Sequence, residues 1–414
     1  MSQNYPLKVL HINNTDLTGR AFNGFDLLDD HLPFNIVAKQ AVINKQSCDS
    51  RVIPILSKKD VRLHKALIEL EKAQSLNCIT YPWANNIASL REFQEADVIH
   101  YHLIHNKVLS ILDFAHLTTL KPSLWTIHDP WFFTGHCVYP SECNGWKQSC
   151  KPCSHLTKPI ELKRDTANTH WACKLNASKK IKAKPIVASE WMRDFFKQSQ
   201  IGRNLPEPDI VPFGIDINLS KAEVSSANIK NKLGIPLDAT VLFFRTHNPE
   251  DKGVFDIFTS LDSLKTDANV ALLTVGDHPI PKNIKARYHT TRVAWTNSRQ
   301  ELFELYKASN IFLMPSNVEA FGLMAIEAMA SARPVIVYEG TALPKIVQAP
   351  KCGIAVEKGN VQELTKAIKY LIEDKVAQEK RGKLGQKIAA EKYSLDSYLS
   401  GLSNLYRQVL QNAQ

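Results

Sequence analysis

Short apolar runs alternate with helix-like stretches along most of this chain. Three of the helix-like stretches lie at 60–75, 301–309 and 361–373. Strands that alternate with helices indicate a parallel, doubly wound sheet, so we expect an α/β fold. The runs that we expect to form strands are 8–12, 36–38, 52–56, 79–81, 98–102, 123–127 and 186–188 in the first half, and 241–244, 270–275, 289–293, 311–314, 334–338 and 352–356 in the second.

The alternation is interrupted once, which indicates two domains. Three prolines between residues 206 and 212 open a polar stretch, after which the pattern restarts. A length of 414 residues also favours two domains. From Leu395 onward, apolar residues recur every three or four positions, as in an amphipathic helix. We therefore expect domains at 1–215 and 216–390, followed by a helix within 391–414.

The composition is that of an ordinary globular protein. Hydrophobic residues make up 44% of the chain and charged residues 22%, which is enough for two cores. No apolar run approaches the roughly 20 residues that a membrane-spanning helix needs. The first ten residues are polar and then enter a short strand, unlike a secretory signal. We expect a cytoplasmic protein.

The formal net charge is +10, and part of the excess lies between residues 151 and 184, where nine Lys or Arg face two acidic residues. We call residues 151–184 the basic stretch. Three interpretations are open: a solvated helix face, a docking patch for an anionic membrane or a lipid diphosphate, and a nucleic-acid surface. No nucleic-acid-binding motif supports the third, so we expect no nucleic acid partner.

The segment 315–334 carries the clearest chemistry. An apolar run ends there in a polar turn with Glu319, and a helix-forming stretch with Glu327 follows. Backbone N–H groups of Phe321, Gly322 and Leu323 would form a helix N-terminus, where a diphosphate binds well. Glu319 could then reach the group that the phosphates carry, and Glu327 could accept hydrogen bonds from a ribose. The alternative is an ordinary core helix with two glutamates.

The two glutamates lie in a recognisable context. Pro-Ser precedes Glu319, Phe-Gly follows it, and Glu-Ala-Met-Ala and Arg-Pro-Val-Ile come downstream. The segment resembles the E-x7-E signature of retaining glycosyltransferases of family 4, which have the GT-B fold. The resemblance implies two Rossmann-like domains facing each other across a cleft, with the C-terminal helix crossing back to the first domain. It covers the chain from about Lys8 to Tyr406.

The same resemblance assigns further residues on the donor side. Arg245 and Lys252, after the first strand of the second domain, would hold the donor diphosphate and stabilise the leaving group, because fixed cations lower the barrier to charge development. Gly276 would allow close backbone approach to the nucleotide. No metal or other cofactor is expected for catalysis. Without the resemblance, Arg245 and Lys252 read equally well as two exposed loop cations.

In the first domain, the resemblance makes His128 a residue that contacts the donor sugar. From sequence alone, a histidine at a strand end is more often a packing or capping residue. Gly19 allows a tight loop, and Arg20 would place a cation towards the diphosphate or the acceptor. We expect Asp129 to orient the imidazole or reach the acceptor. Three further histidines, at positions 100, 102 and 105, are expected in the core or at the rim.

Four cysteines lie within 17 residues of one another: Cys137, Cys143, Cys150 and Cys153. The cluster ends in Cys-x2-Cys, and four thiols suit a tetrahedral structural zinc. A reducing cytosol disfavours disulfides. The alternative is packed or idle thiols. We favour a metal-clamped loop at 136–153, with His136 as a spare ligand.

Together these features predict a retaining, metal-independent glycosyltransferase. It would move a sugar from a UDP- or GDP-linked donor to a hydroxyl of a glycan or a lipid-diphosphate-linked glycan. The resemblance suggests surface polysaccharide biosynthesis (O-antigen, capsule or exopolysaccharide) at the inner face of the plasma membrane. Two alternatives are a sugar-nucleotide epimerase or hydrolase of the same fold, and a zinc-stabilised protein that binds anionic polymers.

Overall fold

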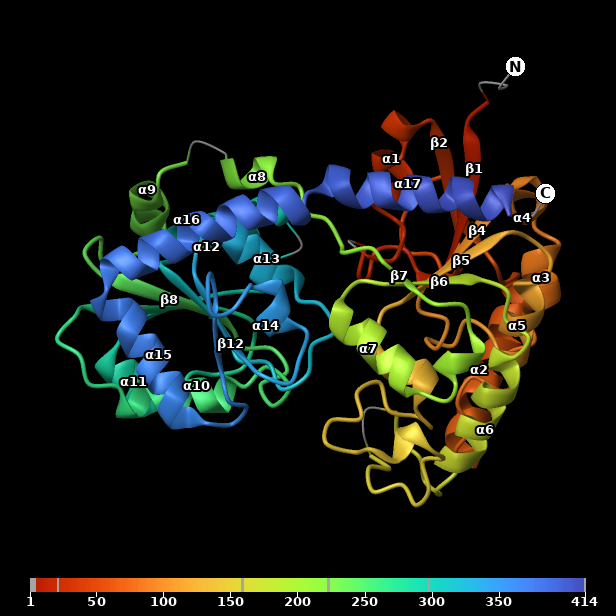
Figure 1. Cartoon of the computed structure of the whole chain (residues 1–414), viewed down its shortest axis with the longest axis horizontal. Coiled ribbons are helices and arrows are strands. Elements are labelled where there is room, and N and C mark those ends of the chain that lie inside the picture. The colour runs from red at the N-terminus through yellow and green to blue at the C-terminus, as the bar shows by residue number, and fades with distance from the viewer. Residues whose placement is uncertain (1–4, 21, 158–159, 222–223, 297, 413–414) are drawn as a thin grey trace. The chain divides into compact units, whose positions relative to one another are not determined.

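The computed structural model describes residues 5–20, 22–157, 160–221, 224–296 and 298–412. The chain forms two compact units (Figure 1). Unit 1 contains Met1–Val211 and Leu399–Gln414, and unit 2 contains Pro212–Tyr398. Each unit is built on a parallel sheet, so the expected doubly wound α/β fold is confirmed.

Unit 1 holds a seven-stranded sheet in the order β3-β2-β1-β4-β5-β6-β7, in which all neighbouring strands are parallel. Its strands are β1 (Leu7–Thr15), β2 (Ile36–Asn44), β3 (Val52–Pro54), β4 (Val98–Tyr101), β5 (Ser123–Ile127), β6 (Lys184–Val187) and β7 (Asp209–Ile210).

The helices of unit 1 cover the sheet and its connections. The α-helices are α1 (Leu27–Asp30), α2 (Lys58–Gln74), α3 (Ala84–Ala88), α4 (Arg91–Glu95), α5 (Ile111–Leu117), α6 (Ala167–Ser178) and α7 (Glu190–Gln198), and the short 3-10 turns are η1 (Leu32–Phe34), η2 (Pro130–Phe133), η3 (Gly145–Lys147) and η4 (Gly202–Asn204). The last helix, α17 (Leu395–Gln411), contributes Tyr406, which is fully buried against His100 of β4.

The prediction of a strand at residues 79–81 is wrong. The carboxylate of Glu71, near the end of α2, accepts hydrogen bonds from the backbone N–H groups of Cys78, Ile79 and Thr80 at 2.9, 2.7 and 2.8 Å. These donors are therefore bound by a side chain, and the segment forms a bend instead of joining the sheet.

Unit 2 holds a six-stranded parallel sheet in the order β10-β9-β8-β11-β12-β13. Its strands are β8 (Thr240–Arg245), β9 (Val270–Val275), β10 (His289–Val293), β11 (Ile311–Met314), β12 (Val335–Tyr338) and β13 (Ile354–Val356). Its helices are α8 (Asn218–Lys221), α9 (Ser226–Lys232), α10 (Val254–Ser263), α11 (Lys282–Arg287), α12 (Arg299–Ala308), α13 (Leu323–Ala330), α14 (Leu343–Ile346), α15 (Val361–Glu373) and α16 (Lys375–Lys392).

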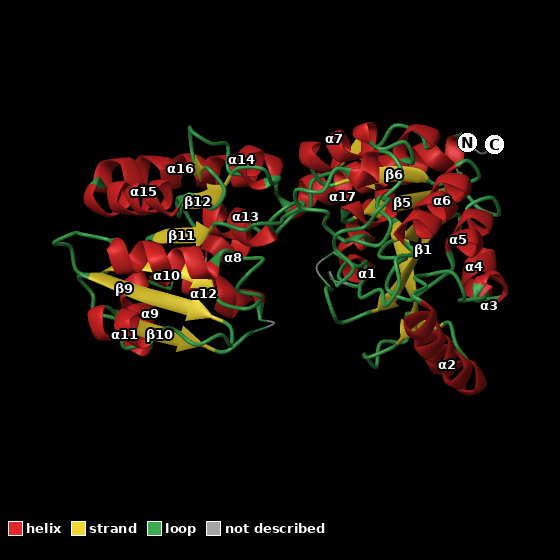
Figure 2. Ribbon diagram, turned by 90° about the horizontal axis from the view of Figure 1, so that it is seen from below, coloured by secondary structure: helices red, strands yellow, loops and turns green. Residues whose placement is uncertain are grey.

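Helices lie on both faces of the unit 2 sheet (Figure 2). α10, α11 and α15 share one apolar core with the strands. On the other face α12 packs against α9 and α13, and α13 packs against α16. Both faces of the central strands are therefore buried, which explains why these strands read as almost continuous apolar runs, whereas the edge strand β10 is polar and partly exposed.

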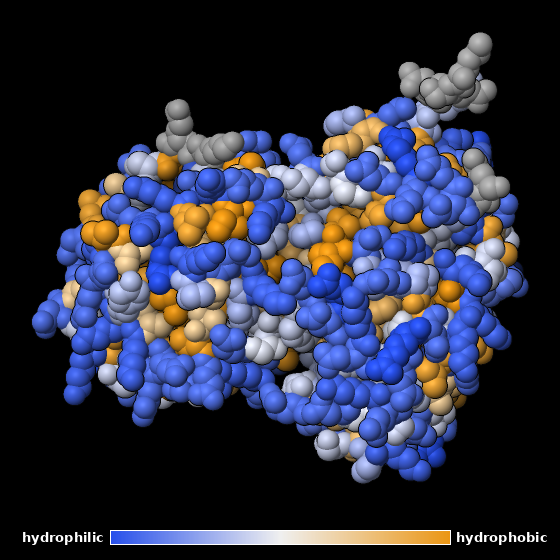
Figure 3. All heavy atoms as spheres, in the orientation of Figure 1, coloured by the Kyte–Doolittle hydropathy of each residue, from blue (hydrophilic) through white to orange (hydrophobic). Residues whose placement is uncertain are grey.

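The surface drawn in Figure 3 is mainly hydrophilic, with separate hydrophobic patches. None of the helices in the described ranges combines the length and the apolar character that crossing a bilayer requires. The basic stretch is not a solvated helix face, because Lys174 is its only cation within α6 and that side chain is fully buried. Lys158 of the same stretch lies outside the described residues.

Candidate functional site

The carboxyl edge of the unit 2 sheet has the topology of a ligand site. From β8 the chain adds β9 and β10 on one side, and it then returns to add β11 on the other. In open α/β sheets the crevice at such a reversal point is where ligands bind. The loops that follow β8 and β11 meet at this point, and they carry the residues that the sequence singles out.

Two glycines let these loops approach closely. Gly253, at the start of α10, has a φ of 64°, and a Cβ there would lie 2.0 Å from the carbonyl oxygen of Pro315 after β11. Gly276 follows β9 with a φ of 126°, and its Cβ would lie 2.7 Å from Thr246 Oγ1. Neither position has room for a side chain, so the three loops form one tightly packed edge.

Lys252 and Glu319 are paired at this edge. Lys252 Nζ lies 2.8 Å from Glu319 Oε2, and both side chains are mostly buried. Arg245, the last residue of β8, stacks over the ring of Trp295 at 4.7 Å. Burial lowers the pKa of Arg245, and the nearby carboxylate of Glu319 opposes that shift. The structure thus brings two cations and one carboxylate together.

The start of α13 lies beside this group. Gly322 has a φ of 105°, and a Cβ there would meet Leu343 Cδ2 at 2.4 Å. The side chain of Phe321 packs against Phe213, with ring centroids 5.2 Å apart. Of Phe321, only the backbone N–H therefore remains as a candidate group for binding a ligand. Among the described residues, the structure shows no acceptor for the N–H groups of Phe321, Gly322 and Leu323. These are the donors that an anion at a helix N-terminus accepts.

Glu327 lies one turn into α13. Its carboxylate accepts a hydrogen bond from a residue that sequence analysis did not single out. Tyr306 of α12 donates from its hydroxyl to Glu327 Oε2 at 3.1 Å. Burial raises the pKa of Glu327 to about 7, against the opposing effect of this hydrogen bond. Tyr306 and Trp295 had no distinguishing sequence signal, because each reads as an ordinary packing aromatic.

In unit 1, the loop after β1 contains the predicted residues Gly19 and Arg20. Gly19 has a φ of 71°, and a Cβ there would lie 2.8 Å from Phe22 Cζ. Arg20 Nε lies 2.5 Å from Asp26 Oδ1, and its guanidinium sits over the ring of Phe25 at 5.0 Å. The charge of Arg20 is therefore already compensated within its own loop.

His128 directly follows β5, and its neighbours differ from those expected. His102 Nδ1 lies 3.4 Å from His128 Nε2, and the ring of Phe22 lies 5.6 Å away. Burial lowers the pKa of His128 to about 3. Asp129 does not orient this ring in the structure: its Oδ1 accepts from Trp131 N at 3.0 Å, and its Oδ2 lies 3.4 Å from His105 Nε2.

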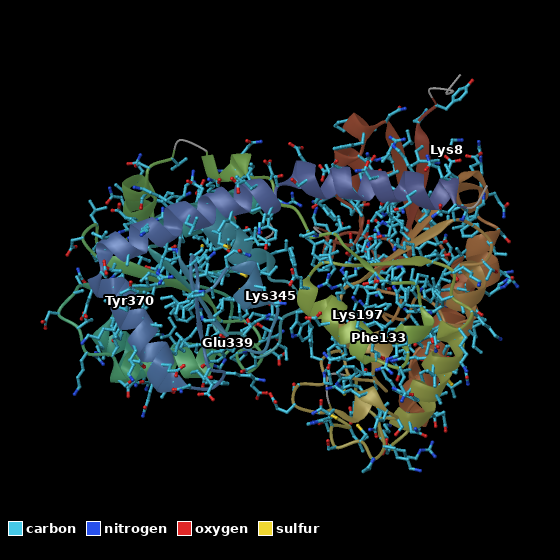
Figure 4. All side chains as sticks on the ribbon, viewed as in Figure 1. Lys8, Phe133, Lys197, Glu339, Lys345 and Tyr370 are labelled. Atoms are coloured by element: carbon cyan, nitrogen blue, oxygen red, sulfur yellow. The ribbon has the colours of Figure 1, made fainter. Side chains whose placement is uncertain are left out.

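The turn after Asp129 is anchored from two sides. Phe133 of η2, labelled in Figure 4, is fully buried. Its ring centroid lies 5.3 Å from that of Phe196 of α7. Lys174 of α6 donates from Nζ to the carbonyl oxygens of Trp131 and Thr134 at 2.8 and 2.9 Å. A buried cation from the basic stretch thus holds the segment that carries His128.

All four predicted zinc ligands line one small pocket together with two histidines; the ligand candidates are His136, Cys137, Cys143, Cys150, Cys153 and His155. His136 places Nδ1 2.9 Å from Ile160 O and Nε2 3.3 Å from Cys153 Sγ. Backbone N–H groups of Gly135 and Gly145 donate to the sulfurs of Cys150 and Cys143. Within the described residues, however, the three donor atoms found within 4.8 Å of one another belong to His11, His100 and His102.

The second half of the chain is similar in sequence to known glycosyltransferases. Residues 225–390, within unit 2, match the family model of glycosyl transferases group 1. An uncharacterized glycosyltransferase of Methanocaldococcus jannaschii is 25% identical over 205 residues, which cover 48% of this chain and 52% of that protein. The lipopolysaccharide 1,2-N-acetylglucosaminetransferase of Salmonella typhimurium is 29% identical over 37% of this chain and 43% of its own length. The chain spans about half the length of the curated relatives it matches.

Solved structures resemble the whole chain. Sucrose-phosphate synthase from Thermosynechococcus elongatus is 16% identical with a TM-score of 0.69, and the match covers 99% of this chain and all of that one. Anabaena HepE in complex with UDP-glucose is 15% identical with a TM-score of 0.64, and the match covers 98% and 99%. At these identities the likeness shows the fold alone, which is the two-domain α/β fold of GT-B glycosyltransferases.

Proposed function

We propose that this protein is a retaining glycosyltransferase of family 4 that uses a nucleotide-diphosphate-sugar donor, UDP- or GDP-linked. The observation that carries the proposal is the 2.8 Å pair of Lys252 and Glu319, beside Arg245 and the start of α13 at the reversal point of the unit 2 sheet. The group 1 domain match supports it, as does the solved complex of HepE with UDP-glucose.

Each donor-side residue has a role that its position suits. Arg245 and Lys252 bind the diphosphate together with the N–H groups of residues 321–323, and Gly276 leaves room for the nucleotide. Glu327 accepts hydrogen bonds from the ribose, and Glu319 contacts the transferred sugar. When donor binds, the diphosphate competes for Lys252, so Glu319 is released towards sugar hydroxyl groups.

The chemistry requires charge stabilisation more than an added base. The bond between the sugar C1 and the diphosphate oxygen breaks, and a bond forms from C1 to the acceptor oxygen on the same face. The acceptor proton passes to the departing diphosphate, so no metal or protein base is needed. Arg245 and Lys252 stabilise the negative charge that develops on the leaving group, as preorganised donors do in other transferases.

We assign the acceptor to unit 1 and to surface polysaccharide biosynthesis. One curated relative is a lipopolysaccharide transferase, and another is named for capsular polysaccharide biosynthesis in Staphylococcus aureus. His128 contacts the sugar, and Gly19 and Arg20 shape the loop beside it. A lipid-linked glycan would bring the exposed cations of the basic stretch to an anionic membrane, where each contributes about 1 kcal/mol.

The decisive experiment measures release of nucleoside diphosphate from a panel of donors with and without acceptor. We expect release that depends on acceptor and falls about a hundredfold in Glu319→Gln, because this change removes a charged contact to the sugar while keeping its shape. Release without acceptor would instead indicate a hydrolase, and conversion of the donor sugar would indicate an epimerase. Unchanged acceptor-dependent release in Glu319→Gln would refute the assigned site.

A structural zinc in the cysteine pocket is a separate proposal. Hydrogen bonds from backbone N–H groups to Cys143 and Cys150 suit thiolate ligands, and binding of the ion would draw the sulfurs closer together. We expect about one zinc per chain by metal analysis, with loss of zinc in Cys150→Ser and retention in Cys48→Ser, whose parent thiol is exposed elsewhere. Purified protein without zinc, or equal zinc in both variants, contradicts the proposal.

A further inference from the structure

A line of three histidines runs through unit 1 to His128. His11 lies on β1, His102 directly follows β4, and His128 directly follows β5. His11 Nδ1 lies 3.0 Å from His102 Nε2, and His102 Nδ1 lies 3.4 Å from His128 Nε2. β1 and β4 flank the point where the strand order of this sheet reverses, so the line begins under the expected ligand crevice of unit 1.

Each of these rings carries one ring proton. Burial lowers the pKa of His11 and His102 well below the usual histidine value, and that of His128 to about 3, so all three are neutral at pH 7. A neutral imidazole has one donor nitrogen and one acceptor nitrogen. Two contacts in series therefore allow two arrangements only. Either all three rings carry the proton on Nδ1, or all three carry it on Nε2.

The buried end of the line selects between the two arrangements. His11 Nε2 is buried and has no hydrogen-bond partner among the described residues. With every proton on Nε2, this atom would be a buried N–H without an acceptor, a group that is rare in native proteins. The arrangement with every proton on Nδ1 avoids that orphan donor.

We propose that His11 and His102 are positioning residues that hold His128 in the Nδ1–H tautomer. The proposal deepens the proposed function, because the tautomer makes the nitrogen that faces away from His102 a hydrogen-bond donor for a sugar oxygen. Neither positioning residue touches the sugar. Both act through the proton that His128 carries.

The loop after β1 fixes both ends of this line. Gly24 has a φ of 97°, and a Cβ there would lie 2.8 Å from His11 Cγ and Nδ1, so its backbone rests directly on the His11 ring. Phe22 of the same loop contacts the His128 ring at 5.6 Å. The loop that contains Gly19 and Arg20 therefore packs against both His11 and His128 and restricts the movement of their rings.

A metal ion is the main competing explanation, since nitrogens of His11, His100 and His102 lie within 4.8 Å of one another. Both nitrogens of His100 are already engaged, however: Nδ1 lies 2.7 Å from Tyr406 Oη, and Nε2 lies 2.7 Å from Thr126 Oγ1. A metal would also need lone pairs on both nitrogens of the His11–His102 contact, whereas a direct hydrogen bond needs a proton there. The geometry favours the hydrogen-bonded line.

The tautomer can be read directly by ¹⁵N NMR of the full chain labelled at histidine. The His128 signals are identified by their loss in His128→Asn. We expect the Nδ1–H pattern for His128, and a mixed or Nε2–H pattern in His11→Phe, although His11 does not contact His128. His31→Phe is the matched control: His31 is equally buried, its ring lies 5.8 Å from His11, and its nitrogens make no hydrogen bond to described residues.

Steady-state kinetics distinguishes a positioning role of His11 from a role in packing alone. We expect kcat to fall about tenfold in His11→Phe, with less change in the donor KM, and to stay within about twofold in His31→Phe. An Nε2–H tautomer of His128 in the unaltered protein overturns the proposal even if a variant fails to fold. So does loss of a bound divalent metal in His11→Phe alone. The NMR result needs no substrate, so its failure is distinguishable from failure of the proposed function.

Discussion

Lys252→Met is expected to lower kcat by a hundred- to a thousandfold, a range of about 3–4 kcal/mol in the barrier. The methionine keeps an unbranched side chain that ends at the position of the lysine Cε, but it removes the cation that faces Glu319 at 2.8 Å. The departing diphosphate then gains charge without this partner, and the uncompensated carboxylate of Glu319 repels it. Steady-state kinetics with saturating acceptor measures the effect, and the donor KM is expected to rise less than kcat falls.

Two controls isolate the cation. Lys383→Met removes an exposed lysine of α16 that pairs with Glu379 at 3.6 Å, and it is expected to leave kcat unchanged. Comparing Lys252→Met/Glu319→Gln with Glu319→Gln removes the repulsion by Glu319 from the measurement. If Lys252→Met keeps kcat close to that of the Lys383→Met control, Lys252 has no part in stabilising the leaving group.

Gly253→Ala is expected to destabilise unit 2 by about 3 kcal/mol. The added Cβ would lie 2.0 Å from the carbonyl oxygen of Pro315, and the φ of 64° is already unfavourable for alanine. The clash involves backbone atoms, so the loops after β8 and β11 must separate. Because Lys252 is the preceding residue, we also expect weaker nucleotide binding. Urea denaturation and thermal stabilisation by UDP and GDP measure the two effects.

Gly234→Ala provides a matched comparison for the same substitution. Gly234 has a φ of 67°, nearly that of Gly253, but a Cβ added there would have nothing within 4 Å of it. We expect a loss of about 1 kcal/mol from backbone strain alone, and unchanged nucleotide binding. Equal losses in the two variants would show that the close approach to Pro315 adds no energy to the strain.

The sequence pattern predicted the fold where local signals and tertiary contacts agree. Residues 361–373 form α15 as expected, since their apolar positions follow helical spacing and Asn360 caps the helix start. Residues 79–81 have strand-like composition but form a bend, because the carboxylate of Glu71 accepts hydrogen bonds from the N–H groups of Ile79 and Thr80. A side chain eight residues earlier decided this, and no property of the segment itself reveals it.

In the candidate site too, some residues could be predicted from a local sequence pattern, and others depend on tertiary packing. The spacing of Glu319 and Glu327 could be read from the chain because both belong to one strand–turn–helix segment. The family resemblance assigned both Lys252 and Glu319 to the donor side but did not predict that they pair, and the contact between these residues, 67 positions apart, comes from the structure. Tyr306 and the line from His11 to His128 depend on which helix or strand packs alongside, so no local pattern could have predicted them.

The position of α17 affects the order in which the chain can fold during synthesis. Unit 2 is continuous, and its last residue is made before Leu399. Unit 1 is interrupted: His100 Nδ1 finds its partner, Tyr406, only after a further 306 residues have been added. During synthesis, unit 1 therefore cannot be completed until the chain beyond unit 2 has been made, although most of unit 1 comes first in the sequence. A chain that ends shortly before Leu399 would contain nearly all of unit 2 but would lack Tyr406, the partner of His100 in unit 1.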